Sequence, residues 1–166
     1  MKIAILSDIH DHIDNLKKAL SKLDAEAIIF CGDMVSPFTT KLLATANLPV
    51  YACLGNNDED QIGLVKNGGA KFTWTHLSQE FGQVELDGKK IAFCHYPKLA
   101  ELLAKTDEYD AVFYGHTHEA KNEKIGNTIL LNPGSICGIN FQTSNYGTAS
   151  YALYDTSSNT AEIIPL

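Results

Sequence analysis

The stretch Ala111-Val112-Phe113-Tyr114-Gly115-His116-Thr117-His118 joins an apolar run to a pair of histidines. Four apolar residues that stop at a glycine are typical of a buried strand. Residues two apart in an extended segment point to the same side, so we expect His116 and His118 to face one site from the strand end. Histidine is the commonest metal ligand, although such a pair can also be hydrogen-bonded or merely exposed. Its meaning therefore depends on what the rest of the chain brings beside it.

Four other apolar runs end in polar residues of similar kinds. They lead into Asp8-Ile9-His10, Gly32-Asp33, Gly55-Asn56-Asn57-Asp58 and Cys94-His95. Taken singly, each motif has an ordinary explanation: a helix N-cap for Asp8, turns for the two glycine motifs, and a hydrogen bond for His95. As an ordered series, each at the carboxyl end of an expected strand, they favour one shared site.

The first half of the chain repeats a strand, a polar loop and a helix. Strands are expected over residues 2–7, 27–31 and 49–54, and helices over 13–23, over 37–46 and, more weakly, before Gly68-Gly69. Asp11 is the expected N-cap of the first helix, and Ser36 that of the second. This alternation predicts parallel strands with functional loops at their carboxyl ends.

The second half changes to antiparallel pairs. Three are expected, over residues 83–94 around an Asp-Gly turn, over 121–132 around Gly-Asn, and over 146–164, with a short helix at 99–105. No linker or repeat divides the chain. We therefore expect a single α/β domain over residues 1–166, a two-sheet mixed β-sandwich flanked by helices (αββα).

The composition limits how a substrate can be held. The 166 residues carry a net charge of −7, and all thirteen basic residues are lysines, so no arginine can clamp a phosphate. Metals, lysine, histidine or backbone N–H groups must hold any anion. The acidic balance also argues against long nucleic acids as partners.

The cysteines and the apolar runs bear on the compartment. Four cysteines lie far apart without Cys-x-x-Cys spacing, which is typical of buried thiols rather than of disulfides or a zinc ribbon. No apolar run is long enough to span a membrane, and the N-terminal one is too short for a signal peptide. We expect a cytoplasmic protein that binds no membrane.

The polar motifs supply more ligands than one metal needs. Two carboxylates, four imidazoles and one amide are available: Asp8, His10, Asp33, Asn56, His95, His116 and His118. Four ligands complete a tetrahedral zinc site, whereas seven suit two metals that share a bridging carboxylate. Nitrogen and oxygen ligands without thiolate are compatible with Mn, Fe, Zn, Ni or Co. We expect two divalent ions, with manganese favoured.

The ordered motifs Asp-x-His, Gly-Asp, Gly-Asn-x-Asp, His and Gly-His-x-His resemble the calcineurin-like metallophosphoesterase superfamily, especially its small bacterial and archaeal phosphodiesterases. Residues 132–135, Asn-Pro-Gly-Ser, resemble the closing loop of that subgroup. The resemblance implies two ligand sets joined by a bridge: Asp8, His10 and His118 on the first metal, Asp33 between the metals, and Asn56, His95 and His116 on the second.

One position departs from the superfamily pattern. Asn57 stands where a histidine often lies near the substrate phosphate, and an amide cannot deliver a proton at neutral pH. The resemblance implies that Asn57 holds a phosphate oxygen and that Asp58 positions its loop or orients His10. With His10, these are the residues we expect to serve catalysis. Esters with acidic leaving groups should be turned over better than those with basic ones.

The implied activity is hydrolysis of small phosphodiesters by in-line attack of a metal-bound hydroxide on phosphorus. Alternatives of the same fold are a phosphomonoesterase, a nuclease, or a protein-binding scaffold like the retromer subunit that has lost part of the ligand set. A homo-oligomer, dimer or tetramer, stays open. Substrate choice would fall to residues 73–81 and 138–146, whose aromatic residues Trp74, Phe141 and Tyr146 could stack on a base or simply pack.

Overall fold

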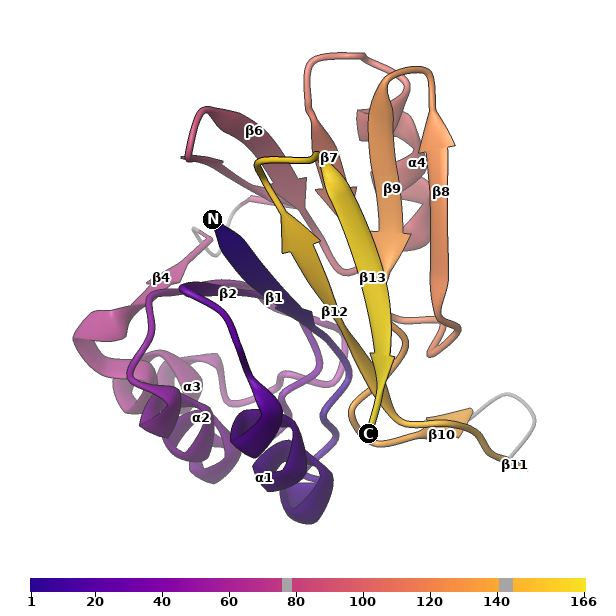
Figure 1. Ribbon diagram of the computed structural model, residues 1–166. Helices are drawn as coiled ribbons and strands as arrows, with labels where there is room; N and C mark the ends of the chain where they lie inside the picture. Colours follow the sequence, from indigo (N-terminus) through magenta and orange to yellow (C-terminus); the bar gives the residue numbers. More distant parts are fainter. Residues whose placement is uncertain (76–78, 141–144) are drawn as a thin grey trace.

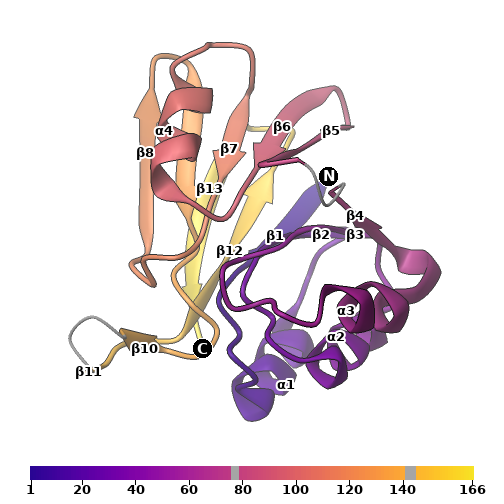
Figure 2. The same ribbon diagram turned by 180° about the vertical axis from the view of Figure 1, so that it is seen from behind.

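The computed structural model describes residues 1–75, 79–140 and 145–166. Two large β-sheets pack face to face, and helices cover the outer side of each (Figures 1 and 2). This four-layer arrangement confirms the expected αββα sandwich.

The first sheet has six strands in the order β13-β12-β1-β2-β3-β4. Their bounds are β1 (Lys2–Leu6), β2 (Ala27–Cys31), β3 (Val50–Cys53), β4 (Phe72–Trp74), β12 (Ser150–Asp155) and β13 (Thr160–Pro165). The strands β1 to β4 run parallel, with Ile5 opposite Ile29 and Ile29 opposite Tyr51. The C-terminal hairpin adds two antiparallel strands beside β1.

Three helices cover the outer face of this sheet: α1 (Ile13–Lys22), α2 (Pro37–Leu43) and α3 (Gln61–Gly68). Buried side chains of α1, such as Leu16 and Ala19, pack with Ala4 and Leu6 of β1. The neighbouring residues Ile3 and Ile5 point the other way, into the core between the sheets. Burial on both faces explains why β1 is apolar almost throughout.

The second sheet has five strands in the order β5-β6-β7-β9-β8. Their bounds are β5 (Gly82–Leu86), β6 (Lys89–Phe93), β7 (Ala111–Phe113), β8 (Lys121–Ile125) and β9 (Thr128–Asn132). Its outer face is covered by α4 (Pro97–Ala104), where Ala100 and Leu103 pack with Val112 and Leu130. A small ribbon, β10 (Ile139–Asn140) with β11 (Asn145–Tyr146), projects beyond the sandwich (Figure 1).

The structure corrects several local expectations. The second helix ends at Leu43 and continues only as a 3-10 turn over Ala44–Ala46, and the strands β4, β10 and β11 were not expected. The N-cap of α1 is His12, whose Nδ1 accepts from the Asn15 N–H at 3.3 Å. The expected cap, Asp11, instead accepts from Ser36 Oγ at the start of α2, where its carboxylate ties two loops together.

The expected hairpins and the buried thiols are confirmed. The strands β5 and β6, and likewise β8 and β9, pair antiparallel around the expected turns, and all four cysteines are buried and free. A single domain over residues 1–166 stays a prediction.

Candidate metal centre

The polar motifs meet where the carboxyl ends of the parallel strands of both sheets converge. The first sheet carries Asp8, Asp33 and Asn56 after β1, β2 and β3, and the second carries His95 after β6 and the two histidines after β7. Hydrogen bonds join the two sheets here: His95 Nδ1 lies 2.8 Å from the Cys31 carbonyl oxygen. All seven expected ligands are therefore brought to one edge of the sandwich.

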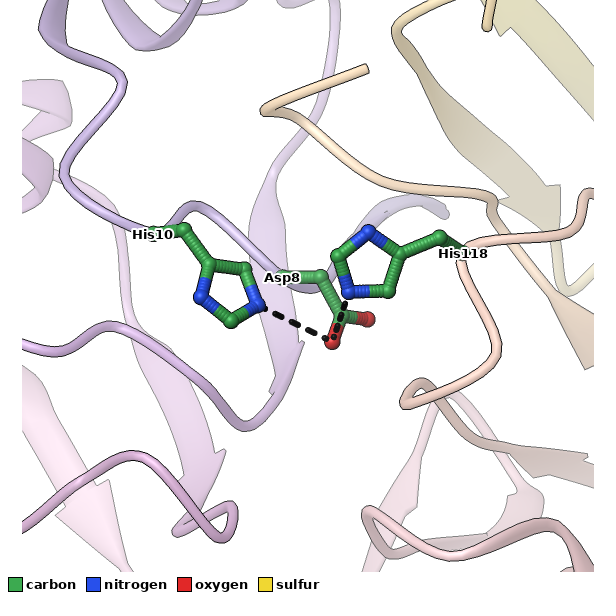
Figure 3. Close-up of side chains that lie close together, drawn as sticks. All are labelled: Asp8, His10 and His118. Atoms are coloured by element: carbon green, nitrogen blue, oxygen red, sulfur yellow. Dashed lines mark ion pairs between the residues drawn. The ribbon is translucent and has the colours of Figure 1, made fainter. Parts of the chain in front are cut away.

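Asp8, His10 and His118 lie close enough together to hold a metal ion, and we call these residues, expected on the first metal, the first ligand group. His118 Nε2 lies 3.2 Å and His10 Nε2 3.8 Å from Asp8 Oδ1, and both rings are directed at this carboxylate (Figure 3). The other oxygen, Oδ2, accepts from Ser7 Oγ at 2.5 Å and from the His116 N–H at 3.0 Å. Asp8 is fully buried, so its Oδ1 is held towards the histidines.

Asn56, His95 and His116 are the residues expected on the second metal, and we call them the second ligand group. Asn56 Oδ1 lies 3.0 Å from His95 Nε2 and 2.9 Å from His116 Nδ1. A neutral His95 donates from Nδ1 to the Cys31 carbonyl, which leaves a lone pair on Nε2 facing the Asn56 oxygen. Two acceptors that face each other need a cation or a proton between them. The chemistry of this donor set therefore fits a metal ion.

Asp33 lies between the two groups. Its Oδ2 is 3.4 Å from His10 Nε2 and 3.4 Å from His95 Nε2. The backbone N–H of Asn57 donates to Asp33 Oδ1, and its side-chain Nδ2 donates to Oδ2, both at 2.8 Å. One carboxylate oxygen thus faces ligands of both groups, the geometry that a shared ligand needs.

The charged groups of the site shift one another's pKa values. Burial alone would raise the pKa of the Asp8 carboxyl, but the imidazoles of His10 and His118 beside it outweigh burial and hold that pKa well below its usual range. Burial likewise acts to lower the pKa of His118, yet its hydrogen bond to Asp8 raises it to about 10. The pKa of His95 is also raised, by Asp33, against the effect of burial. Metal binding would have to displace these protons.

The geometry of the motifs differs from the expected extended arrangement. The strand β7 ends at Phe113, and His116 and His118 have φ of 71° and 59°; Asp8 and His10, at 53° and 43°, are likewise left-handed. The expectation that each pair shares a face of an extended strand was therefore wrong. Left-handed backbone conformations at these four residues bring their side chains together instead. Asp and His tolerate this conformation better than most residues, and such strain is common at functional sites.

Two glycines let the loops approach closely enough. A Cβ on Gly115 would overlap Ser7 Oγ and come within 2.6 Å of Asp8 Oδ2. A Cβ on Gly32 would come within 2.6 Å of His95 Nδ1. The glycines of the motifs are thus required by the approach of the two sheets' loops.

Asp58 and Asn57 both serve the loop that carries Asp33. The buried carboxylate of Asp58 accepts from the N–H groups of Asp33 at 2.9 Å, Val35 at 2.8 Å and Gly55 at 2.7 Å. Asp58 was expected either to position its loop or to orient His10, and these contacts support the first role. The Asn57 amide, expected on the substrate phosphate, is directed at Asp33 in this structure.

Several supporting residues escaped the sequence reasoning. The buried Asn132 donates from Nδ2 to the Gly115 carbonyl at 2.9 Å and to Thr117 Oγ1 at 3.0 Å, so the Asn-Pro-Gly-Ser loop holds the histidine turn. His118 Nδ1 lies 2.5 Å from the Ile139 carbonyl oxygen, which directs Nε2 towards Asp8. Only the resemblance of the loop to its subgroup gave a signal for this. Such contacts depend on tertiary proximity.

Of the three aromatic residues that could stack on a base or simply pack, the structure describes the side chain of one. Trp74 packs its ring on that of Phe72, with the ring centroids 5.3 Å apart. His76, Phe141 and the side chain of Tyr146 lie outside the described residues.

Known proteins are similar to this chain in both sequence and fold. A family model, the calcineurin-like phosphoesterase superfamily domain, matches residues 1–159. A phosphodiesterase of Methanocaldococcus jannaschii is 37% identical over 143 residues, which cover 83% of this chain and 86% of that protein. The structure of an archaeal phosphodiesterase matches over the full length of both chains, with a TM-score of 0.86 and 33% identity.

More distant structures share the fold alone. Vps29 of Chaetomium thermophilum has a TM-score of 0.71 at 17% identity and covers all of this chain, which covers 92% of it. The family match and the 37% identical relative decide the classification. This chain belongs to the calcineurin-like phosphoesterase superfamily.

Proposed function

We propose that the protein is a phosphodiesterase that uses two divalent metal ions to hydrolyse small phosphodiesters. The observation that carries the proposal is the place of Asp33, whose Oδ2 lies 3.4 Å from a nitrogen of each ligand group. The first metal would be held by Asp8, His10 and His118, and the second by Asn56, His95 and His116, with Asp33 shared. When bound, such ions activate water and stabilise the charge that develops on a phosphoryl group.

In this proposal, Asn57 and Asp58 position the metal ligands and take no part in the bond-breaking step. Asn57 fixes the orientation of the shared carboxylate through two hydrogen bonds, and Asp58 fixes the loop beneath it. Asn57 offers no titratable proton to a departing alkoxide. The site therefore suits diesters whose leaving groups are stable as anions.

Charge supports a small substrate. The net charge of −7 and the absence of arginine disfavour long polyanions, whereas a diester of a single phosphate brings one negative charge. Manganese is the favoured metal, because imidazole, amide and carboxylate ligands all suit it. In the described part of the chain, no helix is both long and apolar enough to cross a membrane. The cytoplasmic location and the oligomeric state stay predictions.

A substrate panel tests the proposal. The protein is loaded with Mn²⁺ and assayed on bis-p-nitrophenyl phosphate, p-nitrophenyl phosphate and a single-stranded oligonucleotide. We expect metal-dependent hydrolysis of the diester that exceeds that of the other two. Preference for the monoester or the oligonucleotide would replace the proposal with a phosphatase or a nuclease. No hydrolysis with Mn²⁺, Ni²⁺, Fe²⁺, Zn²⁺ or Co²⁺ would overturn it in favour of a scaffold.

A further inference from the structure

An aromatic side chain outside the ligand set lies against two of the histidines. The ring of Tyr96 is centred 5.1 Å from the ring of His95 and 5.1 Å from that of His116, and those imidazoles are 5.0 Å apart. The three rings form a nearly equilateral triangle. At two corners, an imidazole nitrogen faces Asn56 Oδ1. At the third corner, Tyr96 leaves 42% of its surface exposed.

The backbone holds Tyr96 in this position. It lies between His95, which follows β6, and Pro97, the first residue of α4. The Tyr96 carbonyl accepts from the Ala100 N–H at 3.2 Å, as the first turn of the helix requires. The proline next to it fixes the chain as it enters the helix. The ring is therefore presented by two rigid elements.

Tyr96 is a large side chain that remains exposed beside the candidate metal ligands. The described part of the chain has five exposed large apolar side chains: Phe38, Ile62, Val65, Tyr96 and Leu102. Among these, Tyr96 is the one with ring contacts to candidate metal ligands. An aromatic ring that stays in solvent beside a polar centre is available to a substrate.

A diester has two substituents, and the site must bind at least one of them. Without arginine, and with an acidic chain, little attraction comes from charge beyond the metals. Stacking on an aromatic ring needs no charge and accepts any planar group. We propose that Tyr96 is a substrate-contacting residue that holds a planar aromatic substituent of the phosphodiester, the substituent that does not leave, beside the second ligand group. This inference rests on the proposed function and names its substrate class.

The test compares three esters with the same p-nitrophenolate leaving group. Their second substituent is thymidine, phenyl or methyl, and each is assayed with wild type, Tyr96→Ala, Tyr96→Phe and Leu102→Ala, all loaded with Mn²⁺. Leu102, on α4 and 52% exposed, is the matched control for loss of an exposed side chain. Binding of thymidine 5′-monophosphate and of methyl phosphate is measured by calorimetry, and the metal content of each variant is determined.

We expect Tyr96→Ala to raise KM for the aromatic esters by roughly 10-fold, with kcat, metal content and the methyl ester nearly unchanged. Tyr96→Phe and Leu102→Ala should behave like wild type. A loss on the thymidine ester alone assigns the ring to a nucleobase, and a loss on the phenyl ester alone assigns it to a simple aryl group.

An equal fall on all three esters with reduced metal content would overturn the inference, because Tyr96 would then only support the histidines. So would an unchanged preference for aromatic esters. If no ester is hydrolysed, the proposed function fails, and calorimetry decides the contact separately. Weaker binding of thymidine 5′-monophosphate, but not of methyl phosphate, to Tyr96→Ala would still support it, and equal binding would overturn it.

Discussion

The two ligand groups of the centre differ in charge and in exposure. The first is built on Asp8, a fully buried carboxylate whose pKa is held low by His10 and His118. The second is built on Asn56, an exposed neutral amide, with His116 exposed beside it. A cation gains more from a carboxylate shielded from water than from an amide at the surface. We therefore expect a tight first metal and a weaker, exchangeable second one, on the side where Tyr96 meets solvent.

The largest effect should come from the residue that joins the groups. Asp33→Asn removes the charge that both metals would share, and we expect hydrolysis of bis-p-nitrophenyl phosphate with Mn²⁺ to fall by roughly 10³-fold. Asp24→Asn, at a carboxylate that is 80% exposed, is the matched control and should keep full activity. Undiminished hydrolysis by Asp33→Asn would contradict the two-metal mechanism.

Separate variants should break the two groups independently. Asp8→Asn should weaken the tight phase of a Mn²⁺ titration by about 100-fold or more, because the buried charge is lost. Asn56→Ala should abolish the weak phase and leave one metal per chain. Calorimetric titration of both variants measures this. If each variant weakened both phases alike, the division into two groups would be wrong.

Protons should compete with the metals. The metal-free site favours bound protons: the pKa of His118 is raised to about 10, so its imidazole is protonated at pH 7.5, and the pKa of His95 is raised above its usual value. Binding displaces them, so affinity should fall as the pH is lowered, by about tenfold per pH unit for each proton released. Calorimetry in buffers of different ionisation enthalpy counts the protons. An affinity that did not change between pH 6 and 8 would contradict these assignments.

Asn57 should have the smallest effect and the most informative one. Asn57→Ala removes the Nδ2 hydrogen bond to Asp33, and we expect metal affinity to fall roughly 10-fold. Asn57→His supplies a group that can donate a proton, and it should raise activity on esters with basic leaving groups by several-fold. Rates on alkyl and p-nitrophenyl esters compare the two variants. No gain for Asn57→His on alkyl esters would count against the leaving-group argument.

The sequence was sufficient for the order of the motifs and for the two-sheet architecture. The apolar runs before Asp8, Asp33 and His95 indicate strands, and the convergence of their ends follows from parallel pairing. It could not predict the left-handed turns at Asp8 and His118, because non-glycine residues adopt that conformation only when surrounding contacts enforce it. The same holds for the contact of Tyr96 with two histidines, one of which comes from a different strand.

Short elements escaped prediction for a related reason. The strand β4 has three residues and follows a 3-10 turn at Gly69–Lys71, so its pattern is too short to carry a period. Its pairing with β3 stabilises it. The cap of α1 was misassigned because Asp11 and His12 both precede the helix. The hydrogen bond from the Asn15 N–H to His12 and the contact of Asp11 with Ser36 decide between them.

The central claim is that two metals share Asp33, and counting the metals tests it most directly. The protein is saturated with Mn²⁺ and passed through gel filtration in a buffer that holds free Mn²⁺ at a known concentration. Manganese is then measured by mass spectrometry, and the amount bound is divided by the amount of protein. We predict two manganese ions per chain in wild type and one in Asn56→Ala. One ion or none in wild type, at Mn²⁺ concentrations that support full activity, would contradict the dinuclear centre.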